Sequence, residues 1–129
     1  MSFSAELQRA RVAIINETDE TRQAITIELF NSVILDTPVD TGRARGNWQT
    51  TAKTPAKGKI ERLDQSGSAT TADVVNAVSV SAADGTLYLT NNLPYIEPLE
   101  NGHSGKAPAG MVRKNIARID QILKEKAST

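Results

Sequence analysis

Residues 18–42 read TDETRQAITIELFNSVILDTPVDTG, and this stretch decides the fold of the first third of the chain. Neither glycine nor proline occurs between residues 4 and 35, and apolar side chains such as Ala24 and Ile27 recur at helical spacing. We therefore predict a helical segment over 4–35. Its expected form is a short helix and then, after the polar residues 16–20, a longer one, with a single long helix as the alternative.

A turn should follow this helical segment. Pro38 disfavours helical backbone at the residue before it, so the helix is expected to stop there. Asp40 and Thr41 can bond back to neighbouring backbone groups, and Gly42 permits a positive φ. Pro38, Asp40, Thr41 and Gly42 are therefore predicted to form a structural turn.

Short elements are expected in the rest of the chain. Leu87 and Leu89 alternate with polar residues as in a strand, and Pro108 suits the first turn of a helix. Thr70 or Thr71 is the expected N-cap of the helix before that strand. The predicted elements are a strand and loop region over 45–64, a helix over 70–80, a strand over 86–90, an irregular segment over 91–107 and a helix over 108–126. A strand over 78–81 is the alternative to the end of the first of these helices, and a helical turn over 94–100 is considered within the irregular segment.

Together these elements predict an α+β fold in a single domain over residues 1–129. It should consist of a long N-terminal helical segment, a small antiparallel sheet and a C-terminal helix packed against the sheet. Only five of the 129 residues are aromatic, so we expect a thin aliphatic core and partner subunits that cover part of the surface. No apolar run approaches the ~20 residues that span a bilayer, so no membrane association is predicted.

Charge is balanced over the whole chain but separated along it, with 15 basic and 15 acidic residues. Residues 1–40 carry three basic and seven acidic side chains, residues 41–64 six and two, residues 65–105 none and four, and residues 106–129 six and two. Such blocks suit assembly in which an acidic surface meets a basic surface on another copy. Four ordinary solvent-exposed faces are the alternative.

Composition and motifs argue against catalysis. The chain has no cysteine and one histidine, His103, which excludes thiol chemistry and multi-histidine metal sites. The triplet at 40–42 also occurs in aspartic proteases, but there the Asp lies between strands and shares a proton with a second carboxyl. Here a helix precedes Asp40 and Arg43 follows the triplet, so a turn is the better interpretation. No catalytic residue, cofactor-binding residue or metal ligand is predicted, and a small hydrolase using Asp40 or His103 is the least favoured function.

Two stretches taken together resemble a known protein family. The first is TPVDTGRARGNW at 37–48, and the second is LYLTNNLPYIEPLENGHSGKAPAGMVR at 87–113. Their order and spacing are similar to those of the neck and tail-completion proteins of tailed bacteriophages, the group that includes minor tail protein Z-like proteins. The resemblance covers about residues 18–125.

The resemblance implies a virion structural protein rather than an enzyme. Such a protein is made in the cytoplasm of the bacterial host and forms an oligomeric ring that joins the head connector to the tail. DNA would pass through the channel without specific binding, and the partners would be other copies of the chain and the neighbouring connector and tail proteins. A monomeric or dimeric protein-binding adaptor or assembly factor is the alternative.

Charged and aromatic residues of the two stretches are the candidates for contacts between subunits. We expect Glu97 and Glu100 to meet Arg43 and Arg45 of the next copy, because heterologous contacts of this kind close a ring. The full set of predicted contact residues is Arg43, Arg45, Trp48, Tyr95, Glu97, Glu100 and Arg113.

Overall fold

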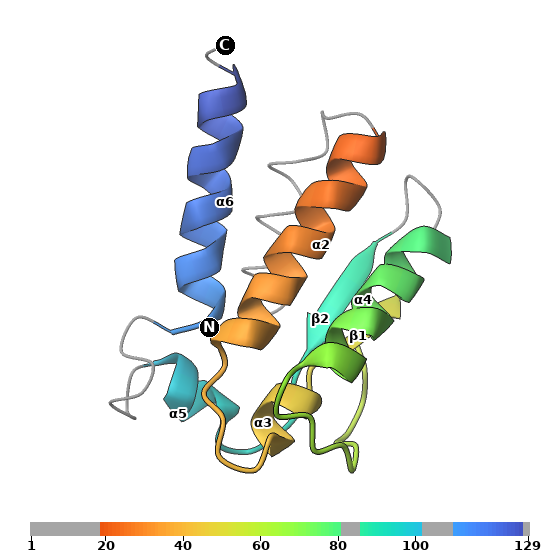
Figure 1. The fold of residues 1–129 in the computed structure, drawn as a ribbon, viewed down its shortest axis with the longest axis vertical. Helices are drawn as coiled ribbons and strands as arrows, with labels where there is room; N and C mark the ends of the chain where they lie inside the picture. Colours follow the sequence, from red (N-terminus) through yellow and green to blue (C-terminus); the bar gives the residue numbers. More distant parts are fainter. Residues whose placement is uncertain (1–18, 81–85, 102–109, 128–129) are drawn as a thin grey trace.

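The computed structural model describes residues 19–80, 86–101 and 110–127 (Figure 1). The predicted α+β class is confirmed, because these ranges contain five helices and one two-stranded antiparallel sheet. The elements in chain order are α2 (Asp19–Asp36), α3 (Arg43–Gly46), β1 (Gln49–Ala52), α4 (Ser68–Val80), β2 (Leu87–Thr90), α5 (Ile96–Glu100) and α6 (Val112–Ala127).

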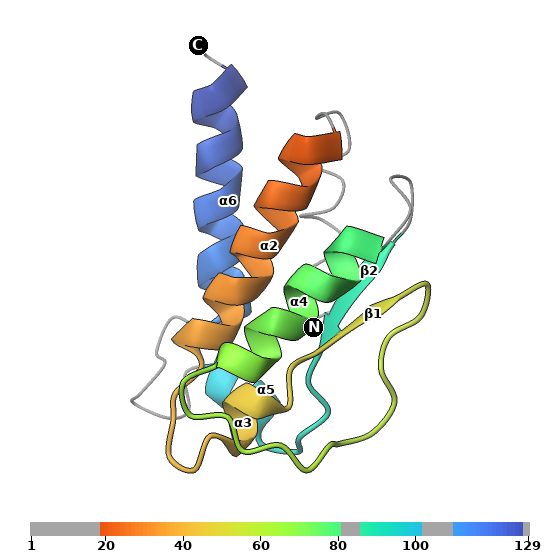
Figure 2. The same ribbon diagram turned by 45° about the vertical axis from the view of Figure 1, so that its right-hand side comes forward.

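The three longer helices lie side by side, with α2 between α6 and α4 (Figures 1 and 2). α2 contacts both of its neighbours, and α4 contacts β1. The strands pair antiparallel with Thr50 opposite Leu89. α4 therefore joins the sheet to the rest of the molecule, while α6 packs mainly against α2.

α2 supplies the largest share of the core. The buried side of α2 is centred on Ile25, Leu29 and Val33. Ala24 is exposed and Ile27 only partly buried, so the apolar face lies further around the helix than their spacing suggested. The other buried members of the core cluster are Phe30, Ile34, Trp48, Val74, Val78, Leu89, Ile96, Met111, Val112 and Ile119.

The middle of the chain departs from the predicted strand and loop region over 45–64. A one-turn helix, α3, comes first, and β1 begins only at Gln49. Gly42 has a φ of 90°, and its carbonyl accepts the Gly46 N–H at 2.8 Å. The Thr41 hydroxyl oxygen also accepts the Arg43 N–H at 3.3 Å. These two bonds close the extra helical turn that the residue preferences did not indicate.

Predicted and observed ends also differ for the last two helices. Within the irregular segment predicted over 91–107, the helical turn considered at 94–100 is present as α5, whereas α6 begins at Val112 instead of residue 108. Gly110 has a φ of 77°, which no right-handed helix permits. Residues 102–109, with Pro108, and residues 4–18 of the predicted N-terminal segment lie outside the described residues.

The helix predicted over 70–80 is present as α4. The carboxylate of Asp64, in the loop just before the helix, caps it instead of Thr70 or Thr71. The Asp64 carboxylate accepts the Gly67 N–H at 3.2 Å, the Thr70 N–H at 2.8 Å and the Thr70 hydroxyl at 2.7 Å. Burial alone would raise the pKa of Asp64, but these hydrogen bonds and the charge of Arg62 outweigh burial and lower that pKa.

Asp64→Ala should lower the free energy of unfolding by about 1–2 kcal/mol at neutral pH, because the first amides of α4 lose their acceptor. The folded-state pKa is lowered, so this stabilisation is complete above the ordinary pKa of about 4 and is lost as the pH falls through the folded-state pKa. Urea unfolding of wild type and variant at neutral and acidic pH measures both effects.

Asp73→Ala is the matched control, because Asp73 forms an exposed ion pair with Arg62 and should cost less than about 1 kcal/mol. Equal losses in the two variants would contradict the capping role of Asp64.

Candidate subunit-interaction surface

Arg45, a predicted subunit contact, is used inside the chain. Its guanidinium donates to the carbonyl oxygens of Leu35 at 2.8 Å, Thr37 at 3.0 Å and Gln65 at 2.6 Å. Carbonyls at the C-terminal end of a helix have no helical donor, and a cation is favoured there. Arg45 therefore closes the end of α2, and the prediction that it pairs with a neighbouring copy is wrong for this conformation.

Trp48, another predicted contact, is completely buried. Its indole N–H donates to the Thr37 hydroxyl oxygen at 2.8 Å, and that hydroxyl donates to the Val33 carbonyl at 2.8 Å. The hydroxyl thus links the indole to the last turn of α2. Trp48 is therefore a core side chain and not the predicted subunit contact, because it lies just before β1 with its side chain buried against α2.

The predicted turn at 38–42 is confirmed by the positive φ of Gly42. A Cβ at this position would lie 2.6 Å from the Gln65 backbone nitrogen, so only glycine fits. Asp64 donates its backbone N–H to the Gly42 carbonyl at 3.1 Å, and the Gln65 side chain reaches the Asp40 carbonyl at 3.4 Å. The turn therefore fixes the 62–67 segment, and the Asp40 residue remains exposed.

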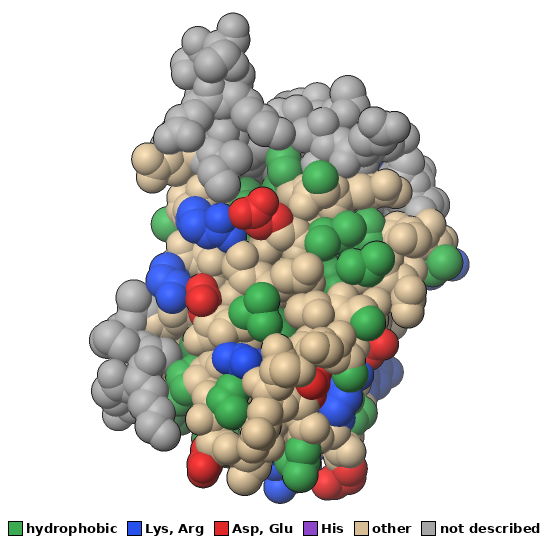
Figure 3. Space-filling view, in the orientation of Figure 1, with side chains coloured by type: hydrophobic (Ala, Val, Ile, Leu, Met, Phe, Trp, Pro, Cys, Tyr) green, Lys and Arg blue, Asp and Glu red, His purple; other side chains and the backbone are tan. Residues whose placement is uncertain are grey.

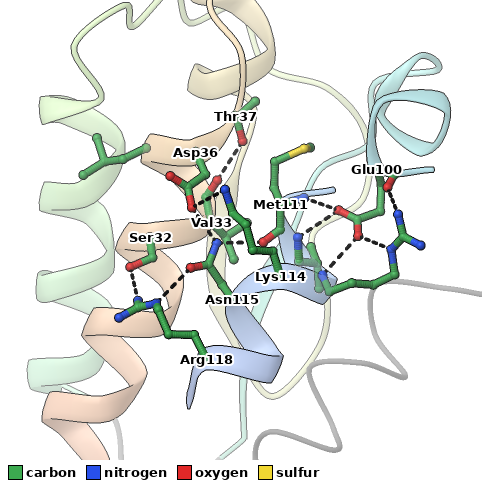
Figure 4. Close-up of polar contacts among 12 residues, drawn as sticks. Ser32, Val33, Asp36, Thr37, Glu100, Met111, Lys114, Asn115 and Arg118 are labelled. Atoms are coloured by element: carbon green, nitrogen blue, oxygen red, sulfur yellow. Dashed lines mark hydrogen bonds and ion pairs between the residues drawn. The ribbon is translucent and has the colours of Figure 1, made fainter. Parts of the chain in front are cut away.

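Glu100 is 6% exposed and caps α6 from the last residue of α5 (Figure 4). Its Oε1 accepts the N–H groups of Met111 and Val112, each at 2.8 Å, and its Oε2 accepts the Arg113 N–H at 3.1 Å. A Cβ on Gly110 would collide with the same carboxylate. An anion here satisfies the free amides and the positive end of the helix.

Arg113 completes this arrangement. Its Nε lies 3.0 Å from Glu100 Oε2, and its terminal nitrogen donates to the Glu100 carbonyl. Arg113 and Glu100 are thus partners within one chain. The prediction that Glu100 meets an arginine of the next copy is wrong, because its carboxylate is buried and fully occupied.

A second polar group that sequence reasoning missed joins α2 to α6 (Figure 4). Asn115 is 1% exposed and donates to Asp36 Oδ2 at 2.9 Å and to the Met111 carbonyl at 2.8 Å. Arg118 donates to Ser32 and forms an ion pair with Glu28 at 2.7 Å. One signal could have revealed it: Asn115 is a polar residue on the apolar face of α6, where buried polar groups need partners.

Three of the seven predicted contact residues remain open to a partner. Tyr95 is 44% exposed, and Glu97 is exposed beside it at the start of α5. Arg43, on α3, is partly buried, and among the described residues its guanidinium has no ion-pair partner. Both ribbon views place α3 and α5 at the end of the molecule opposite the C-terminus (Figures 1 and 2). We call this region, with Arg43, Tyr95 and Glu97, the α3–α5 end.

Exposed apolar side chains accompany the same end. Val39 lies in the turn before α3 and is 36% exposed, and Leu63 precedes the Asp64 that bonds to this turn and is 69% exposed. On the face shown in Figure 3, charged side chains gather along the junction of α2 with α6 and near the lower end, while hydrophobic ones lie over α2 and α4. The α3–α5 end thus combines apolar and charged groups, as protein interfaces do.

The described ranges offer no group of three or more carboxylate or histidine side chains that could hold a metal ion. His103 lies outside the described residues. No helix in the part of the chain that the structure describes is long and apolar enough to cross a membrane.

No protein-family model matches the chain, and no curated protein or solved structure is significantly similar to it. Function is therefore inferred from the motifs and contacts of the chain itself.

Thr37→Val should lower the free energy of unfolding by about 1–3 kcal/mol, because it leaves the buried Trp48 N–H without an acceptor. Thr37→Ser keeps the hydroxyl and should cost less. Trp48 is the only tryptophan, so its fluorescence follows unfolding directly. Equal stability of the Val and Ser variants would show that this hydrogen bond contributes nothing.

Glu100→Ala should cost about 2 kcal/mol or more, because three amides at the start of α6 and the Arg113 side chain lose their acceptor. Glu97→Ala removes an exposed carboxylate from the same short helix and should change stability by less than about 0.5 kcal/mol. Chemical denaturation followed by circular dichroism compares the two. A similar cost for both would refute the capping role of Glu100.

Proposed function

We propose that this chain is a structural subunit of a tailed-bacteriophage virion, where copies form an oligomeric ring in the neck that joins the head connector to the tail. The proposal rests on the resemblance of residues 37–48 and 87–113 to neck and tail-completion proteins. One structural observation supports it most directly. The Asn91 amide, from the second stretch, donates to the Ala44 carbonyl, in the first, at 2.8 Å.

Several polar residues of these two stretches form hydrogen bonds inside the chain, and these bonds explain why the residues are polar. Thr37, Arg45 and Glu100 each satisfy backbone or indole groups that would otherwise be buried without a partner. Polar side chains that are not used in this way remain on the surface of the fold, where they can contact partners. This use of polar side chains favours an assembly protein over a hydrolase, whose reacting groups must stay free to meet a substrate.

The proposed contact between copies uses the α3–α5 end. Of the two arginines and two glutamates expected to pair, Arg45 and Glu100 are bonded within the chain, which leaves Arg43 and Glu97. We infer that Arg43 of one copy meets Glu97 of the next, with Tyr95 supplying apolar area beside the charge pair. This contact pairs α3 of one copy with α5 of the next, so it is heterologous, and it closes a ring when the rotation permits.

Arg43→Glu and Glu97→Arg should each weaken self-association, because each places like charges opposite one another, and the double variant should restore part of it. Sedimentation velocity over a range of concentrations measures the association, and negative-stain electron microscopy shows whether the particles are rings. Asn76→Lys changes the charge of an exposed residue on α4 and is the matched control.

Unchanged association in both single variants would remove this contact. A chain that stays monomeric or stops at a dimer at every concentration would instead support the adaptor or assembly-factor alternative.

A further inference from the structure

Residues 53–59, which follow β1, carry three lysines whose charge no ion pair in the described structure neutralises. Lys53, Lys57 and Lys59 are all exposed, and none lies within ion-pair distance of a described carboxylate. We call residues 53–59 the lysine loop. By contrast, Arg62, Arg113, Lys114 and Arg118 form ion pairs with described carboxylates.

Amide side chains from outside the loop hold its backbone in place. Asn92 donates to the carbonyls of Ala56 and Gly58, each at 3.0 Å, and Gln49 donates to Gly58 at 2.9 Å. Just after the loop, Ile60 donates its N–H to the Asn47 side chain at 2.9 Å. A loop fixed in this way loses little conformational freedom when a partner binds.

Lys53 adds a second observation. Its φ of 73° lies in the left-handed region, where a glycine would fit at lower cost. The neighbouring Thr51 hydroxyl donates to the Thr54 carbonyl at 2.6 Å and closes this turn. Non-glycine residues in this conformation cluster at functional sites. The strained backbone at Lys53 therefore supports a role for this lysine in contacting a partner.

Within the part of the chain that the structure describes, no cluster of carboxylates matches this charge. Among the side chains that the structure describes, the exposed carboxylates without an ion pair are Asp40, Glu61 and Glu97. These three belong to separate segments, and Glu61 follows the lysine loop itself. Duplex DNA, in contrast, carries one phosphate charge per about 1.7 Å of its axis. Three lysines on one fixed loop therefore match a phosphate backbone better than they match the described carboxylates of another copy.

We propose that the lysine loop contacts the phosphate backbone of duplex DNA, so that it lines the channel of the ring. This inference rests on the proposed function, which brings DNA through the channel. In both ribbon views the loop lies on the side of the molecule away from α6 (Figures 1 and 2). Three phosphate contacts give weak, sequence-independent binding, about 40-fold weaker at 200 mM than at 50 mM salt, which lets the DNA slide.

The test uses the full chain and a fluorescein-labelled DNA duplex of about 25 base pairs, titrated by anisotropy at several salt concentrations. The variant Lys53→Gln/Lys57→Gln/Lys59→Gln should reduce the slope of log affinity against log salt by about 2.7. The variant Lys114→Gln/Lys124→Gln/Lys126→Gln removes the same charge from α6 and should keep the wild-type slope. Thermal unfolding confirms that both variants fold.

Each outcome of this titration either supports the proposal or overturns it. No binding by the wild type at low salt, or equal losses in the two triple variants, would overturn the lysine loop as a DNA contact. Tighter binding of poly-glutamate than of DNA would overturn it in favour of an acidic protein partner. Because the titration follows single subunits, it can succeed when the ring does not form and fail when it does, which distinguishes this inference from the proposed function.

Discussion

Each of the three long helices has one end whose backbone groups find hydrogen-bond partners outside the helix. Arg45 supplies donors to carbonyls at and just after the C-terminal end of α2, Asp64 supplies acceptors to the start of α4, and Glu100 does the same for α6. Leaving such groups unpaired in the interior costs about 1–3 kcal/mol each. The packing of α2 against its neighbours depends on these three side chains as much as on the apolar core.

This use of charge inside the chain limits what is left for assembly. Arg45 and Glu100 carry formal charges that would suit a subunit interface, but their geometry commits them to backbone groups of the same chain. Moving either one to meet a neighbour would leave the backbone groups at the end of a helix without their partner. The proposed contacts between copies therefore use side chains without such a task, and Tyr95, just before α5, and Glu97, on α5, meet this condition.

Two surfaces of different chemistry follow from the same fold. The α3–α5 end mixes an exposed aromatic ring with single charges, which suits a protein partner. The lysine loop presents only positive charge, and amide side chains such as Asn92 hold it firmly in place. The proposed ring requires both kinds of surface, since a subunit must bind its neighbours tightly and the DNA in the channel weakly.

Local sequence determined the elements, and tertiary structure decided their roles. Pro38 ends α2, and the alternation of apolar and polar residues around Leu89 gives β2. Both effects act between neighbours along the chain. The partners of Trp48, Glu100 and Asn115 lie 11, 11 and 79 positions away. Residue preferences contain no information about groups that only packing brings together. For this reason the sequence could identify polar residues of importance but could not distinguish a helix cap from a subunit contact.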